Sequence, residues 1–369
     1  MYDVLVIGGG IAGMSAAAAL ALDARVLLLE MESAPGYHAT GRSAAYFAPA
    51  YGNATVRNLT AVSEPFFRDP PPEFAGVPLL RDRASLFIGN ADQQASVAAL
   101  QAENPSLVSL DMQAARGLVP ILRPGLAGAA LLDERGGDLD VDAILQGFRK
   151  LLRIRGGTIL TSSRVDQLGS RDGTWTVQCG EQQFAAGAVV NAAGAWADRI
   201  AVMAGLTPLG LSPMRRTALL VDVPVDSSVN DWPLVIDVDE NFYFKPDAGS
   251  LLISPADETP VSPCDAQPEE LDIALAISRV SEVTSLAVQR VKHSWAGLRT
   301  FAPDRTFVVG FDARAPGFFW LAGQGGYGVQ SSPGMAQLTR FLVTGASIPS
   351  GYEGIRDSVA AVSPDRFMG

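Results

Sequence analysis

The sequence predicts an α/β protein that combines a Rossmann-like unit with an antiparallel sheet, and three observations support this prediction. A strand-like apolar run, a glycine-rich loop and a helix-like segment follow one another in residues 3–20. A second unit of the same kind lies in residues 318–338, near the end of the chain. Between them, residues 217–256 contain alternating, aromatic-rich pieces that are typical of antiparallel strands.

Length and composition restrict the classes of protein to which the chain can belong. The chain has 369 residues, 48% of them hydrophobic, enough for two domains or one large α/β body with ample core. The chain has 28 Lys and Arg and 39 Asp and Glu, which give a net charge of −11. Because it has no cluster of basic residues, it is not expected to bind nucleic acid. Cys179 and Cys264 form no metal or disulfide pattern, so we expect no metal and a reducing compartment.

The hydropathy pattern predicts no membrane-spanning helix, because no segment offers about 18 consecutive apolar residues. The first strand begins at Asp3, and removal of an N-terminal leader would delete the first glycine loop. We therefore expect a cytoplasmic protein, with peripheral contact at the inner face of the membrane left open. The Pro-rich residues 68–74 and the acidic, Pro-containing residues 255–270 are interpreted as surface connections.

The N-terminal unit carries the pattern G-x-G-x-x-G directly after a strand and at the start of a helix. Gly8 allows the tight turn, Gly10 lets a pyrophosphate approach the backbone, and Gly13 lets the helix pack on the strand. The helix N-terminus offers free N–H groups to the pyrophosphate. A second strand, residues 24–30, ends in Glu30, whose carboxylate can bind the ribose hydroxyls of an adenosine. The unit predicts a bound dinucleotide, against the alternative of a glycine turn in a nucleotide-free domain.

The next segment bears on which dinucleotide is bound, since spacing alone does not separate NAD from FAD. Residues 36–52 form a loop rich in glycine and small residues, where an NAD domain usually continues into a plain helix and strand. This loop and several later segments resemble the D-amino-acid oxidase superfamily of FAD-dependent amine oxidoreductases, and within it the bacterial D-arginine dehydrogenases and D-amino-acid dehydrogenases. The resemblance covers nearly the whole chain and rests on GYHATGRSAA (36–45), PLL (78–80), VVNAAGAWAD (189–198), RRTALL (215–220), FYFKPDAG (242–249), QPEELDIA (267–274), HSWAGLRTF (293–301) and FFWLAGQGGYGVQSS (318–332).

The resemblance implies a fold of the D-amino-acid oxidase type, with a discontinuous FAD-binding domain and an inserted antiparallel-sheet domain that binds substrate. The helix-like residues 268–284 are expected to pack on the outer face of that sheet. The FAD-binding domain is expected in residues 1–75, 140–210 and 295–369, and the substrate-binding domain in residues 76–139 and 211–294.

The resemblance also accounts for two glycine loops, because FAD is long and has two different ends. The first loop would hold the ADP half, and the C-terminal loop and its helix would meet the isoalloxazine, whose reduced form carries negative charge that a helix N-terminus stabilises. FAD is expected to be bound non-covalently, although His38 lies in a loop similar to those that attach it covalently in some relatives. The residues expected to bind FAD are Gly8, Gly10, Ile11, Ala12, Gly13, Glu30, Met31, Thr40, Gly41, Arg42, Ser43, Ala44, Ala45, Val165, Ala193, Gly194, Trp196, Gly325, Gly326, Tyr327, Gly328, Val329 and Gln330.

A site that fixes an amino-acid substrate is also implied, since the Cα–H must be held over the flavin. The planar fork of arginine binds a carboxylate in two places. The family pattern places Arg216, Tyr243 and Arg299 around the substrate carboxylate. It places the carbonyl of Gly326 on the amine and Gln330 beside the ring.

Without the resemblance, the local sequence pattern would not assign these arginines to a substrate site. Arg215 and Arg216 are adjacent in a predicted strand, so they point to opposite faces and one of them is expected at the surface. Without the resemblance, Arg299 would be interpreted as a solvated arginine.

The chain departs from the D-arginine dehydrogenase pattern at the side-chain pocket. Ser85 stands where that pattern has an acid, and Tyr46 where it has a histidine, whereas Tyr51 is retained. A buried cation without a counter-charge is costly, so neutral or apolar D-amino acids are expected to be preferred over basic ones. The apolar wall corresponds to Leu234 and Ile236, and a substitute carboxylate could come from Asp82 or Asp237.

The activity implied is oxidative deamination of D-amino acids to 2-oxo acids and ammonia, by hydride transfer from Cα of the neutral amine to flavin N5. No strong base is required, and Tyr46 or a water would take the amine proton. The partners would be a small amino acid and an electron acceptor, either a quinone or oxygen, so a dehydrogenase is expected with an oxidase left open. Three alternatives stay open: oxidation of 2-hydroxy acids or N-methylated amino acids, a flavin subunit of a multi-subunit oxidoreductase, and an NAD-binding module.

Overall fold

The first sheet has eight strands and contains the N-terminal unit. The computed structural model describes residues 1–126, 128–223 and 229–368. The parallel strands are β12 (Gln182–Asn191), β1 (Tyr2–Ile7), β2 (Val26–Leu29), β9 (Thr158–Leu160) and β20 (Phe318–Ala322), which pairs with β12. The antiparallel strands β10 (Gln167–Arg171), β11 (Thr174–Cys179) and β19 (Val308–Phe311) extend the sheet.

Both faces of this sheet are covered, which explains why its central strands are continuously apolar. In β1, Val4 and Val6 pack into one hydrophobic cluster, and Leu5 and Ile7 into another on the opposite face. Helices α1 (Ile11–Leu20), α6 (Val141–Ile154) and α9 (Ser332–Thr344) cover the first face, and α7 (Ala197–Met203) lies on the second. The two predicted units are thus β1 with α1 and β20 with α9. Since β1 and β20 are both parallel to β12, their glycine loops lie at the same edge of the sheet.

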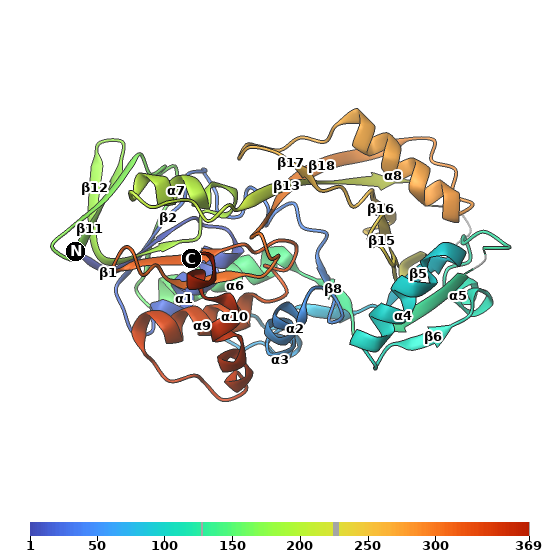
Figure 1. Cartoon of the computed structure of the whole chain (residues 1–369), viewed down its shortest axis with the longest axis horizontal. Coiled ribbons are helices and arrows are strands. Elements are labelled where there is room, and N and C mark those ends of the chain that lie inside the picture. The colour runs from blue at the N-terminus through green and yellow to red at the C-terminus, as the bar shows by residue number, and fades with distance from the viewer. Residues whose placement is uncertain (127, 224–228, 369) are drawn as a thin grey trace.

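The second sheet has nine strands and is largely antiparallel (Figure 1). Its strands in spatial order are β17 (Thr259–Pro260), β13 (Ser212–Val221), β16 (Ser250–Ser254), β15 (Tyr243–Asp247), β14 (Leu234–Asp237), β5 (Ser85–Asn90), β7 (Gly128–Asp133) and β6 (Val108–Leu110). Strand β18 (Val291–Phe301) pairs with β13 along its whole length, so the proposed domain boundary at residue 295 falls inside a strand. The expected helix, α8 (Glu270–Val283), packs against β13 and β16.

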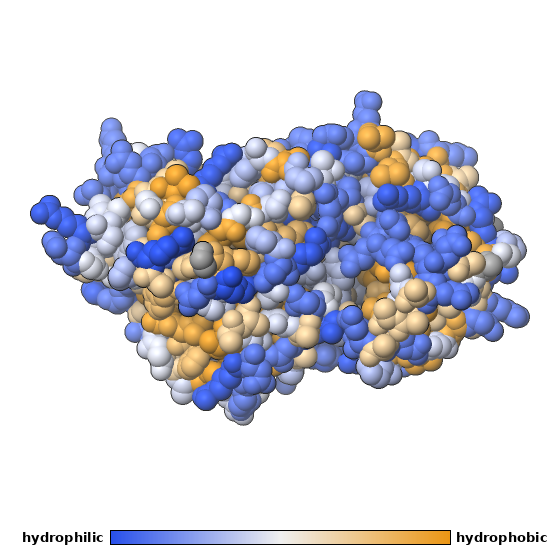
Figure 2. All heavy atoms as spheres, in the orientation of Figure 1, coloured by the Kyte–Doolittle hydropathy of each residue, from blue (hydrophilic) through white to orange (hydrophobic). Residues whose placement is uncertain are grey.

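A three-stranded sheet of β3 (Tyr46–Phe47), β8 (Gly137–Leu139) and β4 (Leu80–Asp82) completes the strands of the described residues. The other helices are α2 (Ala54–Ala61), α3 (Glu64–Arg68), α4 (Gln94–Glu103), α5 (Met112–Leu118) and α10 (Val359–Val362), with single turns at Ala91–Gln93, Gly194–Trp196, Val229–Asp231, Glu353–Ser358 and Pro364–Phe367. Within the described ranges, no helix combines the length and the apolar character needed to cross a bilayer. Hydrophilic side chains are spread over both halves of the face shown in Figure 2.

Candidate functional site

A cavity of about 490 Å³ is lined by residues of both sheets and by both glycine loops. Contacts between the lining residues show the order in which they follow one another along the cavity. Gly9 donates its backbone N–H to Glu30 at 2.7 Å, and a Cβ on Gly328 would lie 3.6 Å from the side chain of Ile11. A Cβ on Gly326 would lie 2.8 Å from Nη1 of Arg299. The cavity therefore runs from Glu30 past the start of α1 to the C-terminal loop and Arg299.

The first glycine loop has a backbone that other residues would disturb. Gly8 has φ +109°, and a Cβ there would lie 2.4 Å from the carbonyl oxygen of Ala192. Gly13 does not line the cavity, because its α-carbon packs against the carbonyl of Gly8, as expected for close helix–strand packing. Gly10 is the N-cap of α1, and a Cβ there would meet only Oγ1 of Thr40, at 3.4 Å. The space beside Gly10 thus belongs to the cavity.

Glu30 follows directly on β2 and is buried in the cavity wall. Its two carboxylate oxygens accept the backbone N–H groups of Gly9 at 2.7 Å and Glu32 at 2.8 Å. Burial raises the pKa of the Glu30 carboxyl, and these two hydrogen bonds only partly offset it. The carboxylate is held in one orientation, with lone pairs left for hydroxyl donors.

Most of the residues expected to bind FAD line this cavity. His38 also lines it, and its Nε2 lies 2.9 Å from Oε1 of Glu32, close to Glu30 in the chain. The predicted residues in the wall are Gly8, Gly10, Ile11, Ala12, Glu30, Met31, Thr40, Arg42, Ser43, Ala44, Val165, Ala193, Gly194, Trp196, Gly325, Gly326, Gly328 and Val329, and those outside it are Gly13, Gly41, Ala45, Tyr327 and Gln330.

Gln330 lies outside the cavity wall, unlike most of the residues expected to bind FAD. It is buried, its Oε1 accepts the backbone N–H of Ala48 at 3.1 Å, and its Nε2 donates to Oγ1 of Thr60 at 2.9 Å. Tyr327 is likewise buried, and its ring packs against those of Tyr51, Phe301 and Phe307, with centroids 5.0, 6.3 and 6.1 Å away. The Gln330 side chain thus fastens the C-terminal loop to Ala48 and Thr60, and the Tyr327 ring packs beside that of Tyr51.

Arg216, Tyr243 and Arg299 meet at the other end of the cavity, from strands β13, β15 and β18. Antiparallel pairing of β13 with β18 sets Arg216 opposite Gly297 and Arg299 opposite Met214. Burial alone would lower the pKa of Arg299, but Tyr51, Tyr243 and Glu240 outweigh it, and the pKa is raised. The guanidinium thus stays charged.

Arg215 corrects the expectation that one arginine of the pair is at the surface. Both arginines are buried, at 7% exposure each. Nε of Arg215 donates to Oδ2 of Asp272 at 3.0 Å, and its Nη1 pairs with Glu269. Because α8 covers the outer face of the sheet, the strand has no solvent-facing side at this point.

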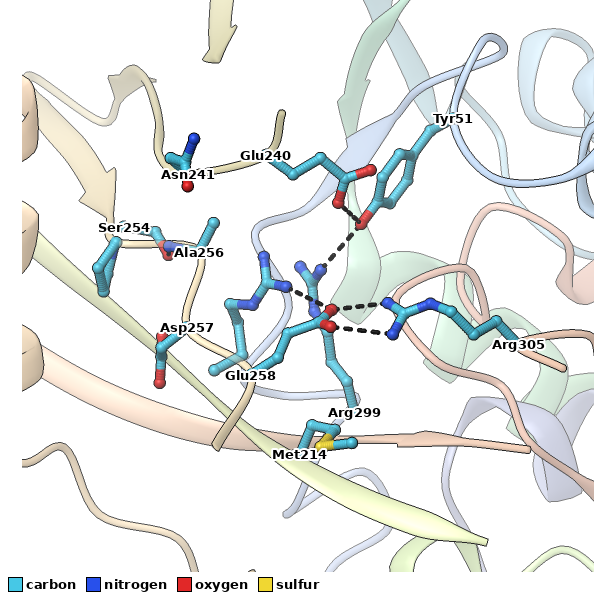
Figure 3. Close-up of polar contacts among 12 residues, drawn as sticks. Tyr51, Met214, Glu240, Asn241, Ser254, Ala256, Asp257, Glu258, Arg299 and Arg305 are labelled. Carbon is cyan, nitrogen blue, oxygen red and sulfur yellow. Dashed lines mark hydrogen bonds and ion pairs between the residues drawn. The ribbon is translucent and has the colours of Figure 1, made fainter. Parts of the chain in front are cut away.

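Two acids at this end were missed by the sequence analysis (Figure 3). Glu258 accepts from Nη2 of Arg216 at 3.0 Å and from both terminal nitrogens of Arg305 at 2.9 and 2.8 Å. Glu240 accepts from the hydroxyl of Tyr51 at 3.0 Å, and Nη1 of Arg299 donates to that hydroxyl at 3.4 Å. Residues 255–270 are therefore more than a surface connection, since Glu258 faces the paired arginines.

The two acids that the sequence left open as substitutes are engaged elsewhere. Asp82 pairs with Arg68 at 2.8 Å on the surface. Oδ2 of Asp237 accepts the backbone N–H groups of Asp239 and Asn241 at 3.1 Å each, and Oδ1 accepts from Nε2 of Gln93 at 3.0 Å. Neither carboxylate lines the cavity, and neither do Leu234 and Ile236.

Ser85 and Tyr46 also lie outside the cavity wall. The hydroxyl of Tyr46 donates to the carbonyl of Arg83 at 2.6 Å and lies 3.0 Å from Oγ of Ser85. Burial raises the pKa of the Tyr46 phenol. A neutral phenol that already donates to a carbonyl is a poor base, so Tyr46 does not suit the role of proton acceptor. Tyr51 does not line the cavity either, but its hydroxyl accepts a hydrogen bond from Nη1 of Arg299, which does line it.

The cavity passes both glycine loops and ends at two arginines, an arrangement typical of a protein that binds a dinucleotide with an anionic group beside it. A family model, DAO, described as FAD dependent oxidoreductase, matches residues 3–342. The uncharacterized oxidoreductase YurR of Bacillus subtilis (strain 168) is 26% identical over 254 residues, which is 65% of this chain and 63% of YurR. The FAD-dependent oxidoreductase domain-containing protein 1 of Bos taurus is 23% identical over 398 residues, 92% of this chain and 81% of that protein. The chain belongs to this family of FAD-dependent oxidoreductases, and it spans less than two thirds of the length of YurR.

Solved structures give the same fold. Glycine oxidase from Geobacillus kaustophilus superposes with a TM-score of 0.83 at 22% identity, over 94% of this chain and 95% of that chain. L-alpha-glycerophosphate oxidase from Mycoplasma pneumoniae, with FAD bound, has a TM-score of 0.83 at 17% identity, over 96% of this chain and 97% of that chain. The D-amino-acid oxidase type of fold is confirmed, and FAD is the cofactor of this family. The narrower resemblance to D-arginine dehydrogenases stays a prediction.

Proposed function

We propose that this chain is a FAD-dependent dehydrogenase that deaminates D-amino acids, with neutral or apolar side chains preferred. The observation that supports this most is the meeting of Arg216, Tyr243 and Arg299 at one end of the cavity. Two buried or partly buried guanidinium groups and a phenol form a site for a carboxylate. A subunit that served only electron transfer or docking would have no use for them.

The residues of the cavity fit FAD in this arrangement. Glu30 would accept from the ribose hydroxyls, and the backbone at Val165 would lie beside the adenine. The pyrophosphate would lie at Gly10, against the N-terminus of α1, in the space that a side chain there would fill. The loop Gly325–Val329 would meet the ring. We propose non-covalent binding, since Nε2 of His38 is already engaged with Oε1 of Glu32 at 2.9 Å.

The chain's own groups would hold the substrate as follows. FAD, when bound, accepts the hydride equivalent that leaves Cα. Arg216 and Arg299 would bind the carboxylate with Tyr243, and the carbonyl of Gly326, next to Arg299, would accept from the amine. With Tyr46 engaged elsewhere, the site selects a substrate amine that is already neutral, and water completes the conversion of the imino acid to the 2-oxo acid and ammonia. We propose a quinone as the electron acceptor, with oxygen as the alternative.

A second candidate substrate class is favoured by Glu240. The position expected to hold a basic side chain carries Ser85, which is uncharged and bonded to Tyr46. Glu240 nevertheless brings a carboxylate to the hydroxyl of Tyr51, beside Arg299. If this acid receives a cationic side chain, D-arginine and D-lysine would be good substrates despite Ser85.

The test is anaerobic bleaching of the visible flavin band by D-amino acids, their L-enantiomers and the matching 2-hydroxy and N-methyl acids. Bleaching by neutral D-amino acids, with D-arginine poor, is the expected result. Efficient bleaching by D-arginine that is lost in Glu240→Gln would support the second candidate. Bleaching only by hydroxy or N-methyl acids would refute deamination of D-amino acids.

The pH dependence of the reaction should show a single rise. The pKa values of the phenols of Tyr51 and Tyr46 are raised by burial, and that of Arg299 is raised by its neighbours, so none of these groups loses a proton as the substrate amine does. We expect log kcat/KM to rise with pH and reach a plateau as the amine becomes neutral. A bell-shaped profile, measured with a neutral D-amino acid, would show that a group of the enzyme has to stay protonated.

A further inference from the structure

Glu258 is a carboxylate built into the outer side of the arginine site (Figure 3). It bridges Arg216, whose side chain is 7% exposed, and Arg305, whose side chain is 45% exposed. Arg305 binds it with both terminal nitrogens, at 2.9 and 2.8 Å, which is the fork geometry that arginine makes with a carboxylate ligand. A carboxylate thus already occupies the position between the inner and the outer arginine.

This position is fixed by the fold. Next to Glu258, Asp257 is buried and accepts the backbone N–H of Thr217 at 2.6 Å. On the other side, β17 pairs with β13, with Thr259 opposite Arg215. Two anchors on β13 therefore hold Glu258 over the neighbouring Arg216.

We propose that Glu258 determines specificity by acting as an internal second carboxylate, so that the site accepts substrates with one carboxylate and rejects dicarboxylates. The inference rests on the proposed carboxylate site of Arg216 and Arg299. Three guanidinium groups, of Arg216, Arg299 and Arg305, face two carboxylates, of Glu240 and Glu258, which leaves one positive charge for a ligand. A second ligand carboxylate would find its arginines occupied and would be repelled by Glu258.

The inner donors stay available for the single carboxylate. Nε of Arg216 is buried and has no hydrogen-bond partner among the described residues, while its Nη2 is held by Glu258. Glu258 therefore also sets which edge of Arg216 is left for a ligand. If Glu258 served only to hold the Arg216 side chain in place, its removal would weaken the binding of propionate and of succinate alike.

Ligand binding to the holoenzyme separates these cases. The flavin spectrum is titrated with propionate and succinate in the wild type, in Glu258→Gln and in Glu258→Ala, with Asp23→Asn as control. Asp23 pairs with Arg340 at 2.6 Å away from the cavity, so the control removes the same charge elsewhere. In the Glu258 variants we expect the Kd of succinate to fall at least about tenfold relative to that of propionate, and the control to leave the ratio unchanged.

Arg305→Gln provides a second variant at a more exposed position that should fold normally. It keeps the internal carboxylate and removes one of its partners, so succinate should bind no better than in the wild type. Equal changes in both Kd values in the Glu258 variants would overturn the inference and leave the proposed carboxylate site intact. Failure of propionate to bind the wild type would instead overturn the proposed site, and the inference with it.

Discussion

Replacement of Arg299 by methionine is expected to lower kcat/KM for the best amino-acid substrate by about 10² to 10³. Truncating one partner of a buried, hydrogen-bonded charge pair costs about 2–5 kcal/mol, and each 1.4 kcal/mol is about tenfold. Arg299 adjoins Gly326, whose carbonyl we propose binds the amine, so its loss would affect both the affinity and the orientation of Cα. Steady-state kinetics with a neutral D-amino acid measures the effect, as an increase in KM together with a decrease in kcat.

Two variants control for this result. Arg171 has a side chain that is 93% exposed and lies outside the cavity, so Arg171→Met removes the same groups without effect on turnover. Arg299→Lys keeps the charge but loses the planar fork, and should recover only part of the activity. An Arg299→Met enzyme with unchanged kcat/KM and normal flavin content would contradict the proposed carboxylate site.

The N-terminal half of the site could be predicted from sequence because its determinants are local. The strand, glycine loop and helix that end at Leu20 are consecutive in the chain, and Glu30 comes directly after the next strand. The close packing of Gly13 on the carbonyl of Gly8 lies within this unit, whereas the contact of Gly8 with Ala192 depends on a segment distant in the sequence. A local pattern of this kind can therefore be recognised from the sequence alone.

The substrate end could be predicted only in part, because its determinants are non-local. Arg216 and Arg299 are brought together by the pairing of β13 with β18, and their assignment depended on the resemblance. Glu258 faces them because β17 adds to the edge of β13, and the short sequence around it has no periodicity that would report this pairing. Arg215 is buried because α8 covers its side of the sheet, which strand alternation cannot show. Prediction of the site from sequence therefore fails where a residue's position depends on strand pairing or on the helix that covers the sheet.

Replacement of Gly10 by valine should separate flavin binding from folding. A Cβ at this position meets only Oγ1 of Thr40, at 3.4 Å, so the branched side chain would project into the cavity where we place the pyrophosphate. The fold should lose only about 1 kcal/mol, the cost of a poorer N-cap for α1. FAD affinity should fall by about 10- to 100-fold, because overpacking of a tight contact costs about 1–3 kcal/mol. Flavin content after purification and the Kd for added FAD measure this effect.

The matched control is Asp111→Val, which weakens another helix cap away from the cavity. Asp111 caps α5 by accepting the backbone N–H of Ala114 at 2.7 Å, so its loss should also cost about 1 kcal/mol of stability. With similar unfolding free energies in the two apo variants, loss of flavin in Gly10→Val alone would assign the effect to the space beside Gly10. Full flavin content in Gly10→Val would mean that the pyrophosphate does not approach the backbone there, and the placement of FAD along the cavity would have to change. Because Gly10 lies on the wall between Glu30 and the C-terminal loop, this variant tests the FAD end of the site independently of the arginines.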